Sequence, residues 1–155
     1  MYKRVLVPLD GSAVAEAIIP FIVAIAGPLD MAVRLLRVLD PIPMVGEIAV
    51  TLDDPGAAEW EAQEYLAPIA AELRGRGVNA SWEVRRGAAA ATIATGAKSF
   101  GADLIAMTTH GRSGLGRLLF GSVTEQVLRH ADVPVFVMRQ TEAQVAARAA
   151  REMTR

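Results

Sequence analysis

The sequence predicts a single doubly wound α/β domain, in which helices cover both faces of a parallel sheet. Short apolar runs recur along the chain without the alternation of a half-exposed strand, which is typical of strands buried on both faces. Segments with helical periodicity lie between these runs. The chain has 155 residues, of which 52% are hydrophobic and 21% charged. This length suits one domain, and this composition excludes a disordered chain.

Five segments are the candidate strands. Four are apolar runs at residues 5–9, 32–39, 104–107 and 133–138, and we expect them to be buried strands of a parallel sheet. The fifth, at residues 80–85, alternates polar and apolar side chains, which favours a strand at the edge of the sheet.

Four segments between the strands are predicted to be helical: residues 12–26, 57–76, 88–98 and 122–130. The first ends before Gly27 and Pro28, which form a stop signal. Pro20 should kink this helix, because it lacks the amide hydrogen that would bond to the carbonyl of Glu16.

Two further segments have no place in the alternation of strands and helices. Residues 40–56 form a proline-bearing connection longer than usual, and such loops are often lids or binding segments. We expect the domain to span residues 1–139, followed by a tail at 140–155 that is helical or frayed.

Charge and cysteine content limit the function classes. The formal net charge is −1, so nothing attracts the chain as a whole to nucleic acid or to an anionic membrane. The longest apolar run, at residues 17–28, is shorter than a membrane span and contains Pro20. The absence of cysteine excludes disulfides and thiolate chemistry. We therefore expect a cytoplasmic protein with neither a nucleic-acid nor a membrane partner.

A glycine-rich stretch, THGRSGLGRLLFGS at residues 109–122, follows a predicted strand and precedes a predicted helix. Ligands of open α/β sheets bind at this edge, and glycines let backbone amides approach an anion. Residues 122–125, Ser-Val-Thr-Glu, fit a capping box. Neither a P-loop nor a Gly-x-Gly-x-x-Gly fingerprint is present. From these residues alone, a phosphate site and a flexible loop before an ordinary capped helix remain equal alternatives.

The same stretch resembles a family motif. Thr108-Thr-His-Gly111, nine further residues and then Gly121-Ser122 are similar to the nucleotide motif of the universal stress protein family, which reads Gly, two residues, Gly, nine residues, Gly and Ser or Thr. Residues 3–12, 35–38, 101–107 and 127–135 also match, so the resemblance extends to Arg139. The chain departs from the motif at its first glycine, which is Thr108 here.

The resemblance implies a five-stranded parallel sheet in the order 3-2-1-4-5, with the switch point between the first and fourth strands. It implies an ATP-binding sensor or regulator that forms a homodimer through the edge strand at 133–138. Whether Mg²⁺ accompanies the nucleotide is left open; if it does, Asp10 would contact the ion through water. Met107 belongs to the implied set, although its apolar neighbours favour the core. The implied nucleotide-binding residues are Pro8, Leu9, Asp10, Val38, Met107, Thr108, Gly111, Arg112, Gly121, Ser122, Val123 and Thr124.

Two other function classes stay open. One is a dimeric protein-interaction module of the same fold that binds no nucleotide, with Thr108 closing the pocket. The other is a slow ATPase or a nucleotidyl- or phosphotransfer enzyme. His110 is a candidate general base, but no nucleophile or carboxylate accompanies it in the local sequence, which favours a structural role. We therefore predict no catalytic residue.

Overall fold

The computed structural model describes residues 1–49, 54–110 and 121–154. Its centre is a five-stranded parallel sheet in the order β5-β2-β1-β6-β7. The strands are β1 (Arg4–Pro8), β2 (Ala32–Leu39), β5 (Asn79–Arg86), β6 (Leu104–His110) and β7 (Val135–Gln140). Counted along the chain, this order is 3-2-1-4-5, so the predicted fold class and strand order are confirmed. The alternating segment at 80–85 lies in an edge strand, as its pattern indicated.

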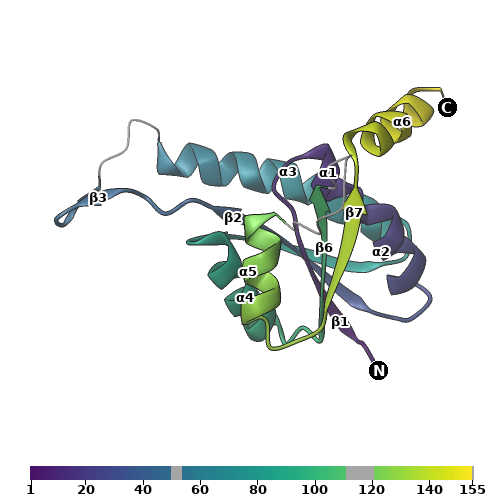
Figure 1. Cartoon of the computed structure of the whole chain (residues 1–155), viewed down its shortest axis with the longest axis horizontal. Helices are drawn as coiled ribbons and strands as arrows, with labels where there is room; N and C mark the ends of the chain where they lie inside the picture. The colour runs from purple at the N-terminus through teal and green to yellow at the C-terminus, as the bar shows by residue number, and fades with distance from the viewer. Residues whose placement is uncertain (50–53, 111–120, 155) are drawn as a thin grey trace, which may run out of the picture.

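Helices cover both faces of this sheet (Figure 1). On one face, α1 (Ala13–Glu16), α2 (Ile19–Ala26) and α3 (Pro55–Gly75) pack on a core that includes Val5, Val33 and Leu35. On the other, α4 (Ala89–Phe100) and α5 (Ser122–His130) pack on Leu6, Leu36 and Ile105. Neighbouring residues of one strand thus point into different cores, which explains why the strands read as continuous apolar runs.

The predicted helix at 12–26 is two helices, so the expectation of a single kinked helix was wrong. Its first part, α1, ends at Glu16, and α2 begins at Ile19 with Pro20 in its first turn. The ring of Pro20 would collide with the carbonyl of Glu16 in a continuous helix. Between the two helices, the hydrogen bonds span three residues instead of four: the amide of Ala17 donates to the carbonyl of Val14, and the amide of Ile18 to that of Ala15. Pro20 then occupies a position in the first turn of α2 where no amide hydrogen is needed.

The long connection after β2 carries a small hairpin of its own. Strands β3 (Met44–Val45) and β4 (Ile48–Ala49) pair in antiparallel fashion, with Gly46 between them at a φ of 63°. The hairpin stands away from the sheet in Figure 1. Residues 50–53 of the connection lie outside the described residues.

The last strand and the tail complete the chain. The edge strand β7 begins at Val135, two residues later than predicted, because Pro134 has no amide hydrogen to add to the ladder. The tail forms α6 (Glu142–Met153), which begins with a capping box between Thr141 and Gln144. Within the described part of the chain, every helix is too short or too polar to cross a bilayer.

Candidate functional site

A cavity of about 330 Å³ opens at the carboxyl ends of β1, β2 and β6. It lies at the switch point, because β1 connects to β2 on one side and pairs with β6 on the other. Ligands of open α/β sheets bind at this place, and the volume is within the range of about 300–1,000 Å³ that is typical of small-molecule sites. The lining residues come from the three strand ends, from α1, from the first two turns of α4 and from the first turn of α5.

Ten of the twelve residues predicted for the site line this one cavity: Pro8, Leu9, Asp10, Val38, Met107, Thr108, Gly121, Ser122, Val123 and Thr124. The other two, Gly111 and Arg112, lie outside the described residues, as does the side chain of His110. Met107 both packs in the core beneath α4 and α5 and lines the cavity, so the two expectations for it are compatible.

The first turn of α5 forms one end of the cavity. The N-cap of this helix is Gly121, with a φ of −57° and a ψ of 154°, and no side chain caps it. Ser122 is the first helical residue, so the prediction of a Ser122–Glu125 capping box was wrong. Glu125 instead pairs with Arg129, at 2.6 Å between Oε1 and Nη2. Residues 122–124 line the cavity, and the amides of a first helical turn have no partner within the helix, which is the arrangement that anion sites use.

Asp10, at the carboxyl end of β1, provides a carboxylate to the cavity wall. Its Oδ1 accepts a hydrogen bond from the amide of Ser12 at 2.9 Å. Partial burial of the carboxyl group opposes ionisation, but hydrogen bonds from Ser12 and the positive charge of Arg37 outweigh it, so the pKa of Asp10 lies below its ordinary value. Asp10 is therefore an ionised acceptor at neutral pH, suited to ligand hydroxyl or amine groups.

The short helix α1 is held against this wall from two sides. The Tyr65 hydroxyl donates to Glu16 Oε1 at 2.9 Å. Burial, together with the hydrogen bond to the Glu16 carboxylate and its charge, raises the pKa of Tyr65, which keeps the phenol neutral and able to donate. On the other side, Thr108 Oγ1 donates to the carbonyl of Ala15 at 3.4 Å. The Thr108 hydroxyl is thus directed at α1, and the cavity persists with a threonine at the first motif position.

Six residues of the cavity wall were missed by the sequence analysis: Ala15, Leu36, Arg37, Ala89, Ile93 and Thr109. Arg37 carried the clearest signal, since it is a charged residue in an apolar strand directly before Val38. Ala89 and Ile93 come from α4, whose first turn reaches the cavity only because of the crossover after β5. Among the described residues, no group of three His, Cys, Asp or Glu side chains is arranged to hold a metal ion.

Comparison with known proteins identifies the class. A model of the universal stress protein family matches residues 1–139. Universal stress protein MJ0531 of Methanocaldococcus jannaschii is 33% identical over 149 residues, which cover 90% of this chain and 84% of that protein. The solved structure of MJ0577, a universal stress protein of the same organism, is 31% identical. It has a TM-score of 0.73 and covers 90% of this chain and 97% of that one.

The structure is a doubly wound α/β fold with a cavity at its switch point, and the family model and the curated relatives specify the family. The chain belongs to the universal stress protein family. A universal stress protein from Archaeoglobus fulgidus, solved in complex with dAMP, shares the fold, with a TM-score of 0.65 at 22% identity over 88% of this chain and 97% of that one.

Proposed function

We propose that this chain binds ATP in the cavity at the switch point and acts as a homodimeric, nucleotide-dependent sensor or regulator in a stress response. The observation that carries the proposal is the composition of the cavity. It combines an apolar wall, a carboxylate and an uncapped helix N-terminus, and its volume is typical of small-molecule sites. These are the three environments that a base, a ribose and a phosphate chain need.

The apolar wall would hold the adenine. Val38 from β2, Met107 from β6 and Ile93 from α4 line it. Met107 and Ile93 belong to the core beneath α4 and α5, and the partly buried Val38 packs against this core. This wall is continuous with packed interior side chains, so its shape is fixed before a ligand arrives. Preformed apolar walls of this kind favour flat rings, and the dAMP complex of the Archaeoglobus fulgidus protein indicates that this fold accommodates an adenine nucleotide.

The polar ends would hold the sugar and the phosphates. The ionised Asp10 accepts hydrogen bonds from ribose hydroxyls, and the first-turn amides of Ser122 and Val123 donate to phosphate oxygens. Mg²⁺ would neutralise the phosphates and contact Asp10 through water, because a single carboxylate fits an ion that keeps most of its water ligands.

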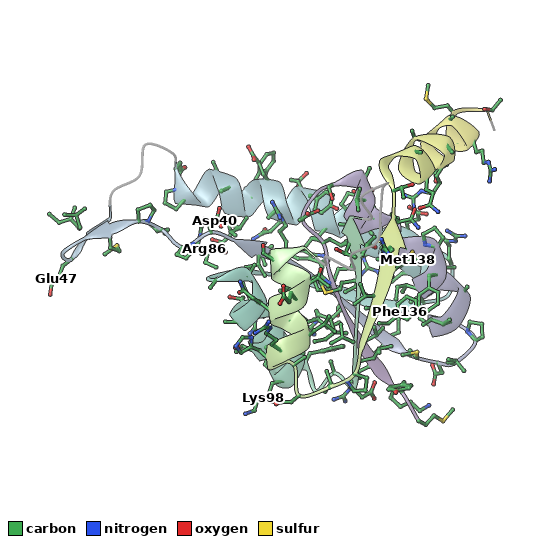
Figure 2. All side chains as sticks on the ribbon, viewed as in Figure 1. Asp40, Glu47, Arg86, Lys98, Phe136 and Met138 are labelled. Atoms are coloured by element: carbon green, nitrogen blue, oxygen red, sulfur yellow. The ribbon has the colours of Figure 1, made fainter. Side chains whose placement is uncertain are left out.

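The edge strand β7 would form the dimer contact. It lies at one end of the sheet order, and Phe136 and Met138, labelled in Figure 2, come from it. The ring of Phe136 stacks on Phe21 of α2, with 4.3 Å between centroids and 4° between planes. An ordered apolar edge favours pairing with a second strand. A dimeric mass by light scattering at micromolar concentration would support this assembly, and a monomeric mass would refute it.

Thermal denaturation tests the nucleotide proposal. A ligand that binds only the native state stabilises it by an amount that grows with the logarithm of ligand concentration above Kd, so ATP should raise the Tm, and the Tm should keep rising logarithmically as the ATP concentration exceeds Kd. GTP is the matched comparison, because it has the same phosphates and a different base. An equal rise with both nucleotides would indicate phosphate binding without adenine recognition. A Tm unaffected by ATP would favour a protein-interaction module that binds no nucleotide.

A further inference from the structure

We infer that Thr109 is the positioning residue of the phosphate end: its hydroxyl fixes the N-cap glycine of α5 and directs its own proton toward a phosphate oxygen. This inference deepens the proposed function and rests on it for the nature of the ligand. It starts from burial, because Thr109 and Thr124 are the two buried polar side chains among the residues that the structure describes, each 4% exposed.

Both buried threonines line the cavity from different elements. Thr109 comes from the carboxyl end of β6 and Thr124 from the first turn of α5. Burying a hydroxyl without a partner costs free energy, so buried polar side chains ordinarily bond to the protein. The Thr124 hydroxyl bonds to none of the described residues, yet no described side-chain nitrogen or oxygen is both fully buried and without a partner, so this hydroxyl is accessible from the cavity that Thr124 lines. A polar pair of this kind within an apolar cavity indicates a ligand that offers hydrogen-bonding oxygens.

Thr109 also has a contact that sets the direction of its proton. The amide of Gly121 donates to Thr109 Oγ1 at 3.3 Å. A threonine hydroxyl has one proton to give and two lone pairs to accept with. Since Oγ1 already accepts from Gly121, its proton points elsewhere, and no acceptor for it lies among the described residues. Thr109 lines the cavity, so among the described surroundings the cavity is the direction left for this proton, and an atom that meets it there is an acceptor.

The same bond determines which amides face the ligand. It uses the amide of the N-cap residue, while the carbonyl of Gly121 accepts from the amide of Glu125 at 3.0 Å. The amides of the first three helical residues, Ser122 to Thr124, have no partner within the helix. Thr109 therefore anchors α5 at its N-cap, and the three residues that carry those amides line the same cavity as the two threonine hydroxyls. A cavity lined by these donors is suited to a phosphate group, which only accepts.

Comparing AMP with adenosine isolates this role, because the two ligands differ only in the phosphate. Wild-type protein should bind AMP more tightly than adenosine in calorimetric titrations. Thr109→Val keeps the shape and removes the hydroxyl, and it should lower the ratio of the two affinities by on the order of tenfold or more, since it removes a bond to a charged group. Adenosine affinity should stay unchanged, which a merely structural role would not predict.

Companion variants keep the result interpretable. Thr109→Ser retains the hydroxyl and should restore the ratio, and Thr109→Ala serves if the valine variant does not fold. Thr95→Val is the matched control, because the Thr95 hydroxyl bonds to the carbonyl of Ala91 on the exposed side of α4. An unchanged ratio in Thr109→Val, a serine variant as weak as the valine variant, or measurable but equal affinities of the wild type for AMP and adenosine would each overturn the inference.

A pyrophosphate titration separates this inference from the nucleotide proposal. Pyrophosphate should shift the backbone amide resonances of residues 122–124 in wild-type protein and in Thr109→Ser, but not in Thr109→Val. That result with no adenosine or AMP binding would reject the proposed function and retain the role of Thr109. Wild-type amides that pyrophosphate leaves unshifted would overturn the inference.

Discussion

Replacement of Arg86 by alanine should release the hairpin connection while leaving the sheet folded. Figure 2 shows Arg86 beside Asp40, where the connection leaves β2. The Arg86 guanidinium donates from Nη1 to the carbonyl of Asp40 at 3.3 Å and from Nη2 to that of Pro55 at 2.6 Å. One half-buried side chain thus joins the two ends of a connection whose hairpin packs little against the rest of the protein.

The magnitude follows from these two bonds. A hydrogen bond from a charged donor contributes about 1.5–3 kcal/mol, and the longer, exposed bond to Asp40 falls below that range. We take about 2 kcal/mol as the loss of local stability in Arg86→Ala, which corresponds to roughly a 30-fold increase in the open population of the connection. The sheet loses no core contact, so opening of β1 and β2 should change far less.

Hydrogen exchange resolved by segment measures the opening of the connection and the opening of the sheet in one experiment. Peptides from 41–49 should exchange on the order of 30-fold faster in Arg86→Ala, with protection of β1 and β2 retained. Arg76→Ala is the control, because Arg76 is an exposed arginine paired with Glu72 at 3.5 Å and contributes little. Unchanged exchange at 41–49, or loss of protection spread evenly over the sheet, would refute this role of Arg86.

Three further changes have defined outcomes. Gly87→Ala should lower the free energy of unfolding in urea by about 1–3 kcal/mol, because Gly87 has a φ of 150° and a methyl group there would collide with the Thr92 hydroxyl; wild-type stability would contradict this. Asp10→Asn should destabilise the protein at pH 7 and much less below pH 3.8, since a carboxyl whose pKa is lowered in the native state stabilises it only while ionised; a gap that widens as the pH falls would oppose it. Thr108→Gly should leave ATP affinity nearly unchanged, because the Thr108 hydroxyl bonds to α1; a tenfold gain in affinity would show instead that Thr108 crowds the site.

The fold could be predicted well from sequence because both sheet faces are covered. Strand β2, covered on both faces, reads as a mainly apolar run that only Arg34 and Arg37 interrupt, and its predicted bounds of 32–39 were correct. The strand order came from the family resemblance, since apolar runs carry no information on which strands are neighbours. The position of the cavity was predicted by the same resemblance together with the rule that ligands of open α/β sheets bind at the switch point.

The features that the sequence did not predict depend on individual contacts in the folded chain. One is the break between α1 and α2: a proline can either kink a helix or end it, and the sequence around Pro20 does not distinguish the two outcomes. Ser122 carries a capping signal, but Gly121 becomes the N-cap because Thr109, distant in sequence, bonds to its amide. Arg37 and Ile93 reach the cavity through crossovers between strands, which local periodicity does not reveal.

The most direct test of the central claim is a calorimetric titration of MgATP into nucleotide-free protein, with Gly121→Val alongside. The variant should fold, since Gly121 has a φ of −57° and an added Cβ would lie 3.7 Å from Thr109 Oγ1, an ordinary contact. Its side chain would occupy the phosphate end of the cavity. We predict saturable binding to one site per chain in the wild type and its loss in the variant. Absence of binding by folded wild-type protein at millimolar MgATP would contradict the account.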